Sequence, residues 1–225
     1  MNRTRTIELA LLAGATGLAL VFVLATGIDL WFSGLFYSES AGFYLRNAWW
    51  VRLLYEMVHP LAGILILALL AALVYNLVRR RAVGRFNTRT VLYLLTVFAL
   101  GPGLVVNVVF KSEWGRARPR DIVEFGGERT FTPAFVISDQ CERNCSFPSG
   151  HSSIPFALSA FAFVFWRRRR LFYTGAAAFG GLVGLGRIAQ GAHFLSDVVF
   201  SGIFVFVIAY LLARYVFKLP ETDSA

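Results

Sequence analysis

The chain has 225 residues, of which 57% are hydrophobic and 16% charged, and its net charge is +9. Its mean hydropathy of +0.62 is that of a membrane protein rather than a soluble domain. The basic residues flank long apolar runs and form no stripe on a soluble face, which excludes nucleic-acid binding. Two cysteines are too few for a disulfide scaffold.

Long apolar segments dominate the chain from end to end. The first follows Arg3 and Arg5, is longer than a signal-peptide core and lacks a clean cleavage site, so it predicts an uncleaved span. Six segments are long enough, or nearly so, to cross about 30 Å of hydrocarbon, and the fourth is the shortest. They are residues 7–28, 54–78, 90–110, 152–166, 171–190 and 196–217. These segments predict an all-α, polytopic six-helix bundle, one domain over 1–225 with an outer loop at 111–150.

Lys and Arg are unevenly distributed between the two sides of this bundle. The N-terminus, the 79–89 loop, the 167–170 turn and the tail together carry 13 of them, against nine on the other side. By the positive-inside rule, both termini are predicted to be cytoplasmic. The 111–150 loop is then periplasmic.

Three polar stretches fall on the predicted periplasmic side. They are "KSEWGRARP" at 111–119, "PSGH" at 148–151 and "GRIAQGAHFLSD" at 186–197. Polar and ionisable residues near a bilayer are costly, so their gathering on one side indicates a functional site.

Several residues in these stretches suit the binding of a phosphate. Lys111, Arg118 and Arg187 are fixed positive charges, and arginine offers a planar fork that matches phosphate oxygens. Ser149 and Gly150 lie where the fourth helix is expected to begin, so their N–H groups would be free to bind an anion. Glycine there lets the backbone approach closely.

Three other residues suit the chemistry of phosphoryl transfer. His193 and Asp197 are four apart, which on a helix places them on one face. Asp197 could then accept from one ring nitrogen of His193 and leave the other nucleophilic. His151, at another helix end, could act as general acid. The set predicts phosphoryl transfer that needs neither a metal nor a cofactor.

The three stretches together resemble the signature of the type 2 phosphatidic acid phosphatase superfamily, a group of integral-membrane lipid phosphate phosphatases. The matching motifs are K-x6-R-P from Lys111, P-S-G-H from Pro148 and R-x5-H-x3-D from Arg187. Their order, spacing and sidedness all match, and the resemblance covers about residues 50–215.

The resemblance implies a role for each matching residue. His193 would form a phosphohistidine supported by Asp197, and His151 would protonate the leaving group. One position departs from the pattern, because Gly186 stands where the family usually has serine, so one hydroxyl contact to phosphate is absent. The resemblance implies that the phosphate is held by Lys111, Arg118, Ser149, Gly150 and Arg187.

The outer loop carries further features. Cys141 and Cys145 are candidates for a disulfide, which an oxidising compartment favours. A metal site formed by these cysteines and His151 is rejected because no fourth ligand is evident. The further arginines of the loop share it with several carboxylates, so pairing within the loop is favoured. The alternative is contact with a polyanionic headgroup, for which Arg116 and Arg120, which flank the motif arginine, are the best candidates.

Two features lie outside the motifs. The stretch "GGLVGLG" at 180–186 follows no strand and is therefore not a nucleotide-binding fingerprint, and Gly180 and Gly184 predict close helix packing instead. Glu56 and His59 fall near the outer end of the second span, where a structural role is expected, with lining of the cleft as the alternative.

These observations predict a metal-independent lipid phosphatase with a periplasmic site in a bacterial inner membrane, and no nucleic-acid or obligate protein partner. The cysteine-containing loop and extra arginines are similar to those of lipid A phosphatases, so lipid A is the favoured substrate. Undecaprenyl diphosphate and phosphatidylglycerol phosphate are alternatives, and the position cleaved on lipid A is open. A transporter would instead carry ionisable residues in mid-span. A non-catalytic lipid-binding member would not need both histidines and the aspartate.

Overall fold

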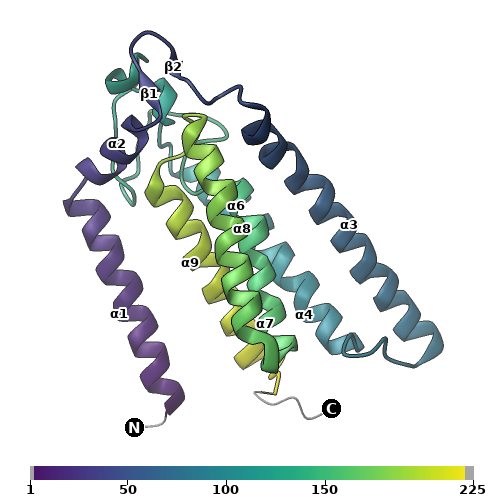
Figure 1. Cartoon of the computed structure of the whole chain (residues 1–225). Coiled ribbons are helices and arrows are strands. Elements are labelled where there is room, and N and C mark those ends of the chain that lie inside the picture. The colour runs from purple at the N-terminus through teal and green to yellow at the C-terminus, as the bar shows by residue number, and fades with distance from the viewer. Residues whose placement is uncertain (1–2, 221–225) are drawn as a thin grey trace.

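The computed structural model describes residues 3–220 and is mostly helical, as predicted (Figure 1). The α-helices are α1 (Arg3–Leu24), α2 (Gly27–Gly34), α3 (Trp49–Arg79), α4 (Thr88–Phe98), α5 (Lys111–Glu113), α6 (Gly150–Phe156), α7 (Phe161–Val164), α8 (Arg169–Ala189) and α9 (Leu195–Leu211). Two π-helical segments, η1 (Ala99–Phe110) and η6 (Leu212–Val216), extend α4 and α9. Short 3-10 turns are η2 (Pro119–Asp121), η3 (Val123–Phe125), η4 (Ala157–Ala160) and η5 (Trp166–Arg168). A small antiparallel hairpin pairs β1 (Tyr37–Ser38) with β2 (Gly42–Phe43).

Four of the predicted spans are helices long and apolar enough to cross a membrane. Within the described residues these are Trp49–Arg79, Thr88–Phe110, Trp166–Ala189 and Leu195–Val216. The predicted first span is instead a pair of helices, Leu12–Leu24 and Gly27–Gly34, bent by 76°. The part of the chain that the structure describes therefore supports four spanning helices, or five if the bent pair is one span.

The predicted fourth span is shorter than expected. Its helical part, Gly150–Val164, falls below the length of a spanning helix. At 1.5 Å per residue, 15 residues extend over about 22 Å, less than the hydrocarbon thickness. Pro155 lies inside α6, and the chain continues as the 3-10 segment η4 before α7. A count of apolar residues does not detect these interruptions.

Helix α8 packs closely against its neighbours, as its glycines predict. A Cβ atom at Gly184 would lie 2.3 Å from the Val198 side chain, and one at Gly180 would lie 2.5 Å from the ring of Phe156. Both distances are shorter than any real contact, so glycine is required for α6, α8 and α9 to approach each other. This close packing fixes the starts of α6 and α9 relative to the end of α8.

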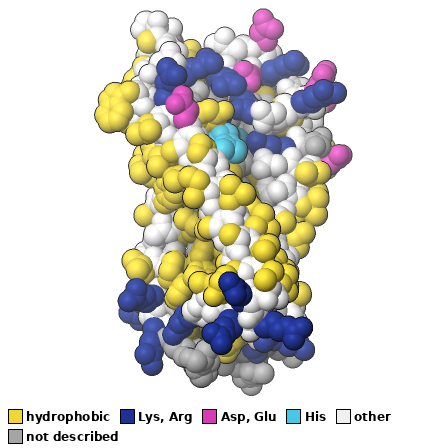
Figure 2. All heavy atoms as spheres, turned by 90° about the vertical axis from the view of Figure 1, so that its right-hand side faces the viewer, with side chains coloured by type: hydrophobic (Ala, Val, Ile, Leu, Met, Phe, Trp, Pro, Cys, Tyr) yellow, Lys and Arg dark blue, Asp and Glu magenta, His cyan; other side chains and the backbone are white. Residues whose placement is uncertain are grey.

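The two ends of the bundle differ. Helix α1 begins and α9 ends at the same end, while α2, the hairpin and the 111–149 loop cover the other (Figure 1). Figure 2 shows an apolar middle between two ends rich in Lys and Arg, and the acidic side chains visible on this face lie at the loop end. Exposed arginines at the opposite end include Arg79, Arg80, Arg81, Arg167, Arg168 and Arg170. The loop end carries the site described next.

Candidate active site

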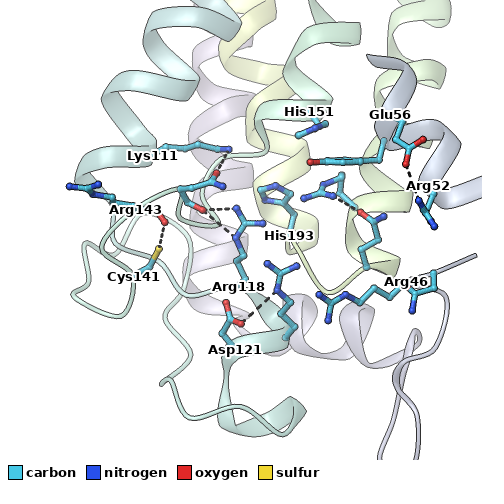
Figure 3. A pocket seen from close by; sticks show the side chains of 16 residues that line it. Arg46, Arg52, Glu56, Lys111, Arg118, Asp121, Cys141, Arg143, His151 and His193 are labelled. Carbon is cyan, nitrogen blue, oxygen red and sulfur yellow. Dashed lines mark hydrogen bonds and ion pairs between the residues drawn. The ribbon is translucent and has the colours of Figure 1, made fainter. Parts of the chain in front are cut away.

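A cavity of about 600 Å³ lies at the loop end of the bundle (Figure 3). Lys111, Arg118, His151 and His193 point toward this common space (Figure 3). All three predicted motifs therefore contribute to one cavity. Its lining residues are Arg46, Asn47, Arg52, Tyr55, Glu56, Lys111, Arg118, Arg120, Asp121, Cys141, Arg143, Asn144, His151, Arg187, Gln190 and His193.

His193 lies in the loop between α8 and α9 and is fully buried among protein atoms. Its Nδ1 lies 2.7 Å from the carbonyl oxygen of Ser146. A carbonyl only accepts, so Nδ1 carries the proton and Nε2 carries the lone pair. Nε2 has no hydrogen-bond partner among the described residues. Burial, and then Arg187, Arg118 and Lys111, lower the pKa of His193 well below its usual value, which keeps the imidazole neutral.

Asp197 does not bind His193 in the way the spacing predicts. Its Oδ2 atom is 3.6 Å from Nδ1 of His193 and instead accepts from the Phe194 N–H at 2.7 Å and from the Ser146 hydroxyl. The expectation of a shared helix face is wrong because α9 begins at Leu195, so His193 lies outside the helix. Asp197 is the third residue of α9, where its carboxylate caps the helix by accepting from the N–H of Phe194, the N-cap residue. It acts on His193 through Ser146, which provides both the hydroxyl and the carbonyl.

Arg116 is not placed to contact a headgroup, and it pairs with carboxylates outside the outer loop rather than within it. It is fully buried and does not line the cavity. Its guanidinium donates to Asp197 at 2.5 Å, to Asp29 at 2.8 Å and to the Ser196 hydroxyl at 2.9 Å. The centroid of the Phe194 ring lies 4.2 Å from Cζ of Arg116. A buried guanidinium needs buried carboxylates, and this network takes one of them from α2, far away in the sequence.

Two of the predicted phosphate-binding cations are held by the same residue. Nζ of Lys111 donates to the side-chain oxygen of Asn144 at 3.0 Å, and the Arg118 guanidinium donates to the Asn144 carbonyl at 2.5 Å. Burial, and then repulsion by Arg118 and Arg187, lower the pKa of Lys111 to about 8. An anion placed among these cations would relieve that repulsion.

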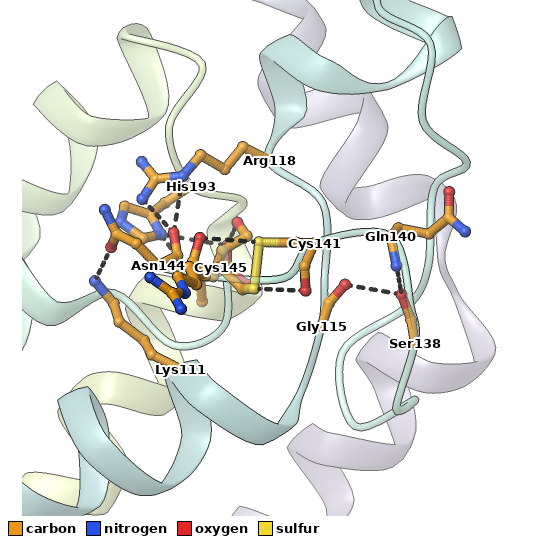
Figure 4. The surroundings of a disulfide bond; sticks show 12 residues. Lys111, Gly115, Arg118, Ser138, Gln140, Cys141, Asn144, Cys145 and His193 are labelled. Carbon is orange, nitrogen blue, oxygen red and sulfur yellow. Dashed lines mark hydrogen bonds and ion pairs between the residues drawn. A yellow bond between two sulfur atoms is a disulfide. The ribbon is translucent and has the colours of Figure 1, made fainter.

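Asn144 lies within the loop closed by the disulfide between Cys141 and Cys145 (Figure 4). Its φ of 52° is in the left-handed region, which asparagine tolerates better than most residues. Figure 4 shows Lys111 and Arg118 converging on this loop. The sequence pointed to the cysteines, but no motif pointed to Asn144.

The predicted helix-start residues are only partly available to a ligand. The Ser149 N–H donates to the Asp197 carbonyl at 3.0 Å, and its hydroxyl pairs with that of Ser152. Ser149 is fully buried, so its amide is not the free donor that was expected. Gly150 is needed for close approach, because a Cβ there would lie 2.4 Å from the Asn107 side chain and 3.1 Å from Nζ of Lys111.

Helix α3 completes the wall around His151. The ring of Tyr55 stacks on the ring of His151, with 4.4 Å between the ring centroids. The ring of His59 meets the ring of His151 edge-on, with 4.6 Å between the centroids. The surroundings of Tyr55 are also cationic, with the Arg187 guanidinium 4.6 Å from its ring. Arg187 also donates to the side chain of Gln190. Sequence reasoning missed Tyr55 and Gln190, since an aromatic near a membrane interface and a loop glutamine carry no specific signal.

Within residues 3–220, no group of three or more His, Cys, Asp or Glu side chains is placed to hold a metal ion. The cavity instead presents a neutral histidine surrounded by cations. A family model described as the PAP2 superfamily matches residues 90–221, more than half of the chain. The chain belongs to the PAP2 superfamily. The resemblance predicted from the three motifs is thus confirmed.

Curated relatives extend the similarity over most of the chain. A lipid A 4′-phosphatase of Francisella tularensis subsp. novicida is 35% identical over 210 residues, covering 89% of this chain and 91% of the relative. A lipid A 4′-phosphatase of Rhizobium leguminosarum is 33% identical over 212 residues, covering 86% of this chain and 89% of the relative. A lipid A 1-phosphatase of Rhizobium etli is 38% identical over 134 residues, 56% of this chain and 53% of the relative. No solved structure matches the chain.

This PAP2 protein has features outside the family match. The matched region begins at residue 90, after α1, α2 and α3. Asp29, Arg46 and Tyr55, which contribute to the buried network and to the cavity wall, precede it. The N-terminal third therefore contributes to the site although the family motifs do not reach it.

Proposed function

We propose that this chain removes the 4′-phosphate of lipid A at the periplasmic face of a bacterial inner membrane through a phosphohistidine intermediate. One observation carries the proposal: a buried, neutral His193 whose Nε2 is unpartnered among the described residues lies in a cavity with Lys111, Arg118 and Arg187. The relatives named lipid A 4′-phosphatase support the choice of substrate and position.

In the proposed first step, the three cations hold the phosphate oxygens and Nε2 of His193 attacks phosphorus in line. The P–N bond forms as the P–O bond to the sugar breaks. Burial, and then Arg187, lower the pKa of His151 in the empty cavity, so His151 takes up a proton together with the phosphate anion and gives that proton to the departing oxygen. Ser146 holds the proton on Nδ1 of His193, so the attacking lone pair stays on Nε2. The cations neutralise the charge on the equatorial oxygens.

In the second step, water attacks the phosphohistidine and the neutral His151 takes a proton from it. The P–N bond breaks, inorganic phosphate leaves and His193 returns to its neutral form. No step in this scheme needs a metal or a cofactor, because fixed cations neutralise the phosphate. Asp197 and Arg116 position Ser146 and the start of α9. Gly150, the remaining residue of the predicted phosphate-binding set, lets the phosphate approach the backbone closely.

The proposed topology has six crossings, with the bent α1–α2 pair and the short Gly150–Val164 segment as the two irregular ones. An even number of crossings leaves both termini on one side of the membrane, which in this proposal is the cytoplasm. The 13 Lys and Arg residues on the side of the termini, against nine on the side of the cavity, support this orientation. A reporter fused after residue 130 should read periplasmic, and a cytoplasmic reading would reverse the orientation.

The catalytic proposal is tested with purified protein in the presence of EDTA. It should release phosphate from lipid A, and His193→Ala should lower the rate by about two orders of magnitude or more. Rapid acid-free quenching with a labelled phosphate donor should trap the label on wild-type protein and not on His193→Ala. Unchanged activity of that variant, or a strict requirement for metal, would refute the mechanism.

The substrate is tested separately from the chemistry. Mass spectrometry of lipid A from cells with and without the protein should show loss of the 4′-phosphate when it is present. Undecaprenyl diphosphate and phosphatidylglycerol phosphate remain the alternative substrates. Hydrolysis of either one with lipid A left untouched would keep the enzyme class and change the substrate.

A further inference from the structure

The cavity carries more positive charge than one phosphate can neutralise. Seven of its lining residues are Lys or Arg and only two are Asp or Glu, which leaves an excess of five positive charges. A phosphate monoester supplies about two negative charges at neutral pH. The seven cations are Arg46, Arg52, Lys111, Arg118, Arg120, Arg143 and Arg187.

Four of these cations lie outside the proposed phosphate clamp of Lys111, Arg118 and Arg187, and they are not equivalent. Arg52 pairs with Glu56 at 3.4 Å on α3. Arg143 points away from His193 at the far rim (Figure 3). Arg120 forms a longer ion pair, 3.7 Å between its Nε and Oδ1 of Asp121, which also lines the cavity. The Arg46 side chain has no hydrogen-bonded or ionic partner among the described residues, and it reaches toward the Arg118 side of the cavity.

The backbones of Arg46 and Arg120 are both held close to Gly191, that of Arg120 directly and that of Arg46 through Phe43. The Arg120 N–H donates to the Gly191 carbonyl at 3.0 Å. Gly191 has a φ of +62°, and a Cβ there would lie 2.4 Å from the ring of Phe43. The Phe43 carbonyl in turn accepts from the Arg46 N–H at 3.0 Å. Gly191 precedes the proposed nucleophile His193 by two residues, so the backbones of both arginines have fixed positions relative to it, and their side chains can reach into the cavity.

The charge of Arg120 disfavours the charged form of its neighbour Arg118 when the cavity is empty. Burial, and then the nearby Arg120, lower the pKa of Arg118. Two guanidinium groups that repel each other at the wall of a cavity gain stability when an anion binds between or beside them. A planar arginine fork is well suited to phosphate oxygens.

We propose that Arg46 and Arg120 form a second anion subsite, which binds another phosphate of a bis-phosphorylated lipid headgroup while the first one lies at His193. This inference rests on the proposed function. The relatives are named for the 4′- and 1-positions of lipid A, so that lipid carries a phosphate at each. The subsite makes the enzyme selective for a headgroup that still has both of its phosphates.

The test compares two substrates with the full-length protein in detergent micelles. They are lipid A with both phosphates and lipid A with the 4′-phosphate alone, and phosphatidic acid serves as a reference. Wild-type kcat/KM should be about tenfold higher for the bis-phosphorylated form. Arg46→Ala and Arg120→Ala should each remove most of this preference, and each should lower kcat/KM for the bis-phosphorylated form by a larger factor than kcat/KM for phosphatidic acid. The charge-retaining Arg46→Lys should preserve part of it.

Arg143→Ala is the matched control, since it removes an exposed cation from the opposite rim and should leave the preference intact. Equal use of both forms by wild-type protein, or equal losses in all three alanine variants, would overturn the subsite. If neither lipid A form is hydrolysed, the proposed function fails. The subsite is then still tested by the dissociation constants of the two lipid A forms. Equal constants for the two forms in wild-type protein refute the subsite. Tighter binding of the bis-phosphorylated form by wild-type protein, lost in Arg46→Ala and Arg120→Ala, supports it.

Discussion

Asp29 offers the sharpest test of how the N-terminal segment supports the site. Its carboxylate is 1% exposed and accepts from the Arg116 guanidinium at 2.8 Å, the Ser196 N–H at 2.9 Å and the Ser196 hydroxyl at 2.5 Å. Asp29→Ala removes all three contacts and leaves the buried guanidinium with Asp197 as its remaining carboxylate. We expect a large loss of stability.

The magnitude follows from burial. Breaking a buried ion pair by removing one partner costs about 3–5 kcal/mol. Because Asp197 still pairs with Arg116, the loss for Asp29→Ala should lie near the lower end, at about 3 kcal/mol. Asp29→Asn keeps an acceptor for Ser196 and should cost less. The exposed Arg52–Glu56 pair, with side chains 63% and 59% exposed, gives the contrast, and Glu56→Ala should cost about 0.2–1 kcal/mol.

The assay is equilibrium unfolding in mixed micelles, followed by circular dichroism and by tryptophan fluorescence. The order of free-energy losses should be Asp29→Ala, then Asp29→Asn, then Glu56→Ala. Equal losses for Asp29→Ala and Glu56→Ala would show that burial of this network does not determine stability. A specific further readout is the rate of phosphate release, which Asp29→Ala should also lower because Arg116 shifts relative to Asp197.

Three further predictions concern the clamp and the packing of α8. The pKa of Lys111 is about 8, so its charge is present below this pH and lost above it, and kcat/KM should fall as pH rises through about 8. Asn144→Gly keeps the left-handed backbone and removes only the acceptor for Lys111, so KM should rise about two- to tenfold. Gly184→Ala should lower stability by about 1–3 kcal/mol because its Cβ would overlap Val198.

Each of these has a matched control. Lys111→Arg keeps the charge at high pH and should remove the alkaline fall in kcat/KM. Asp139→Ala, in the same loop but outside the cavity, should leave KM unchanged. Gly181→Ala places its Cβ in open space and should leave stability unchanged or slightly raised, so a loss equal to that of Gly184→Ala would contradict the packing argument.

The sequence predicts which residues meet at the cavity but not how they bind each other. Lys111, Arg118, His151 and Arg187 carry recognisable chemistry and lie at helix ends on one side, so alternation of the spans is enough to bring them together. His193 and Asp197 do lie close together, but the predicted hydrogen bond between them on one helix face is wrong because the spacing of four has two interpretations. Within a helix it forms one face, whereas across a helix start it forms a cap.

Contacts over long sequence separations are beyond the reach of pattern reasoning. Asp29 and Ser196 are 167 residues apart, and neither lies at a position that the motifs specify. Neither the loop pairing nor the headgroup contact considered for Arg116 is correct. A charged residue in a loop is usually exposed, and only the tertiary structure reveals the two buried carboxylates, Asp29 and Asp197, beside it. The span count differs for a related reason: apolar content measures length in residues and ignores the interruption at Pro155.

Asp197 combines several tasks in a single residue. Its carboxylate caps α9, receives Arg116 and orients Ser146, while its carbonyl holds the Ser149 N–H at the start of α6. The start of two helices and the orientation of the nucleophile therefore depend on one residue. An inactive Asp197 variant is consequently weak evidence for a chemical role. Ser146→Ala separates the structural role of Asp197 from its effect on the nucleophile. This variant removes the hydroxyl that links Asp197 to His193 and leaves the cap of α9 in place.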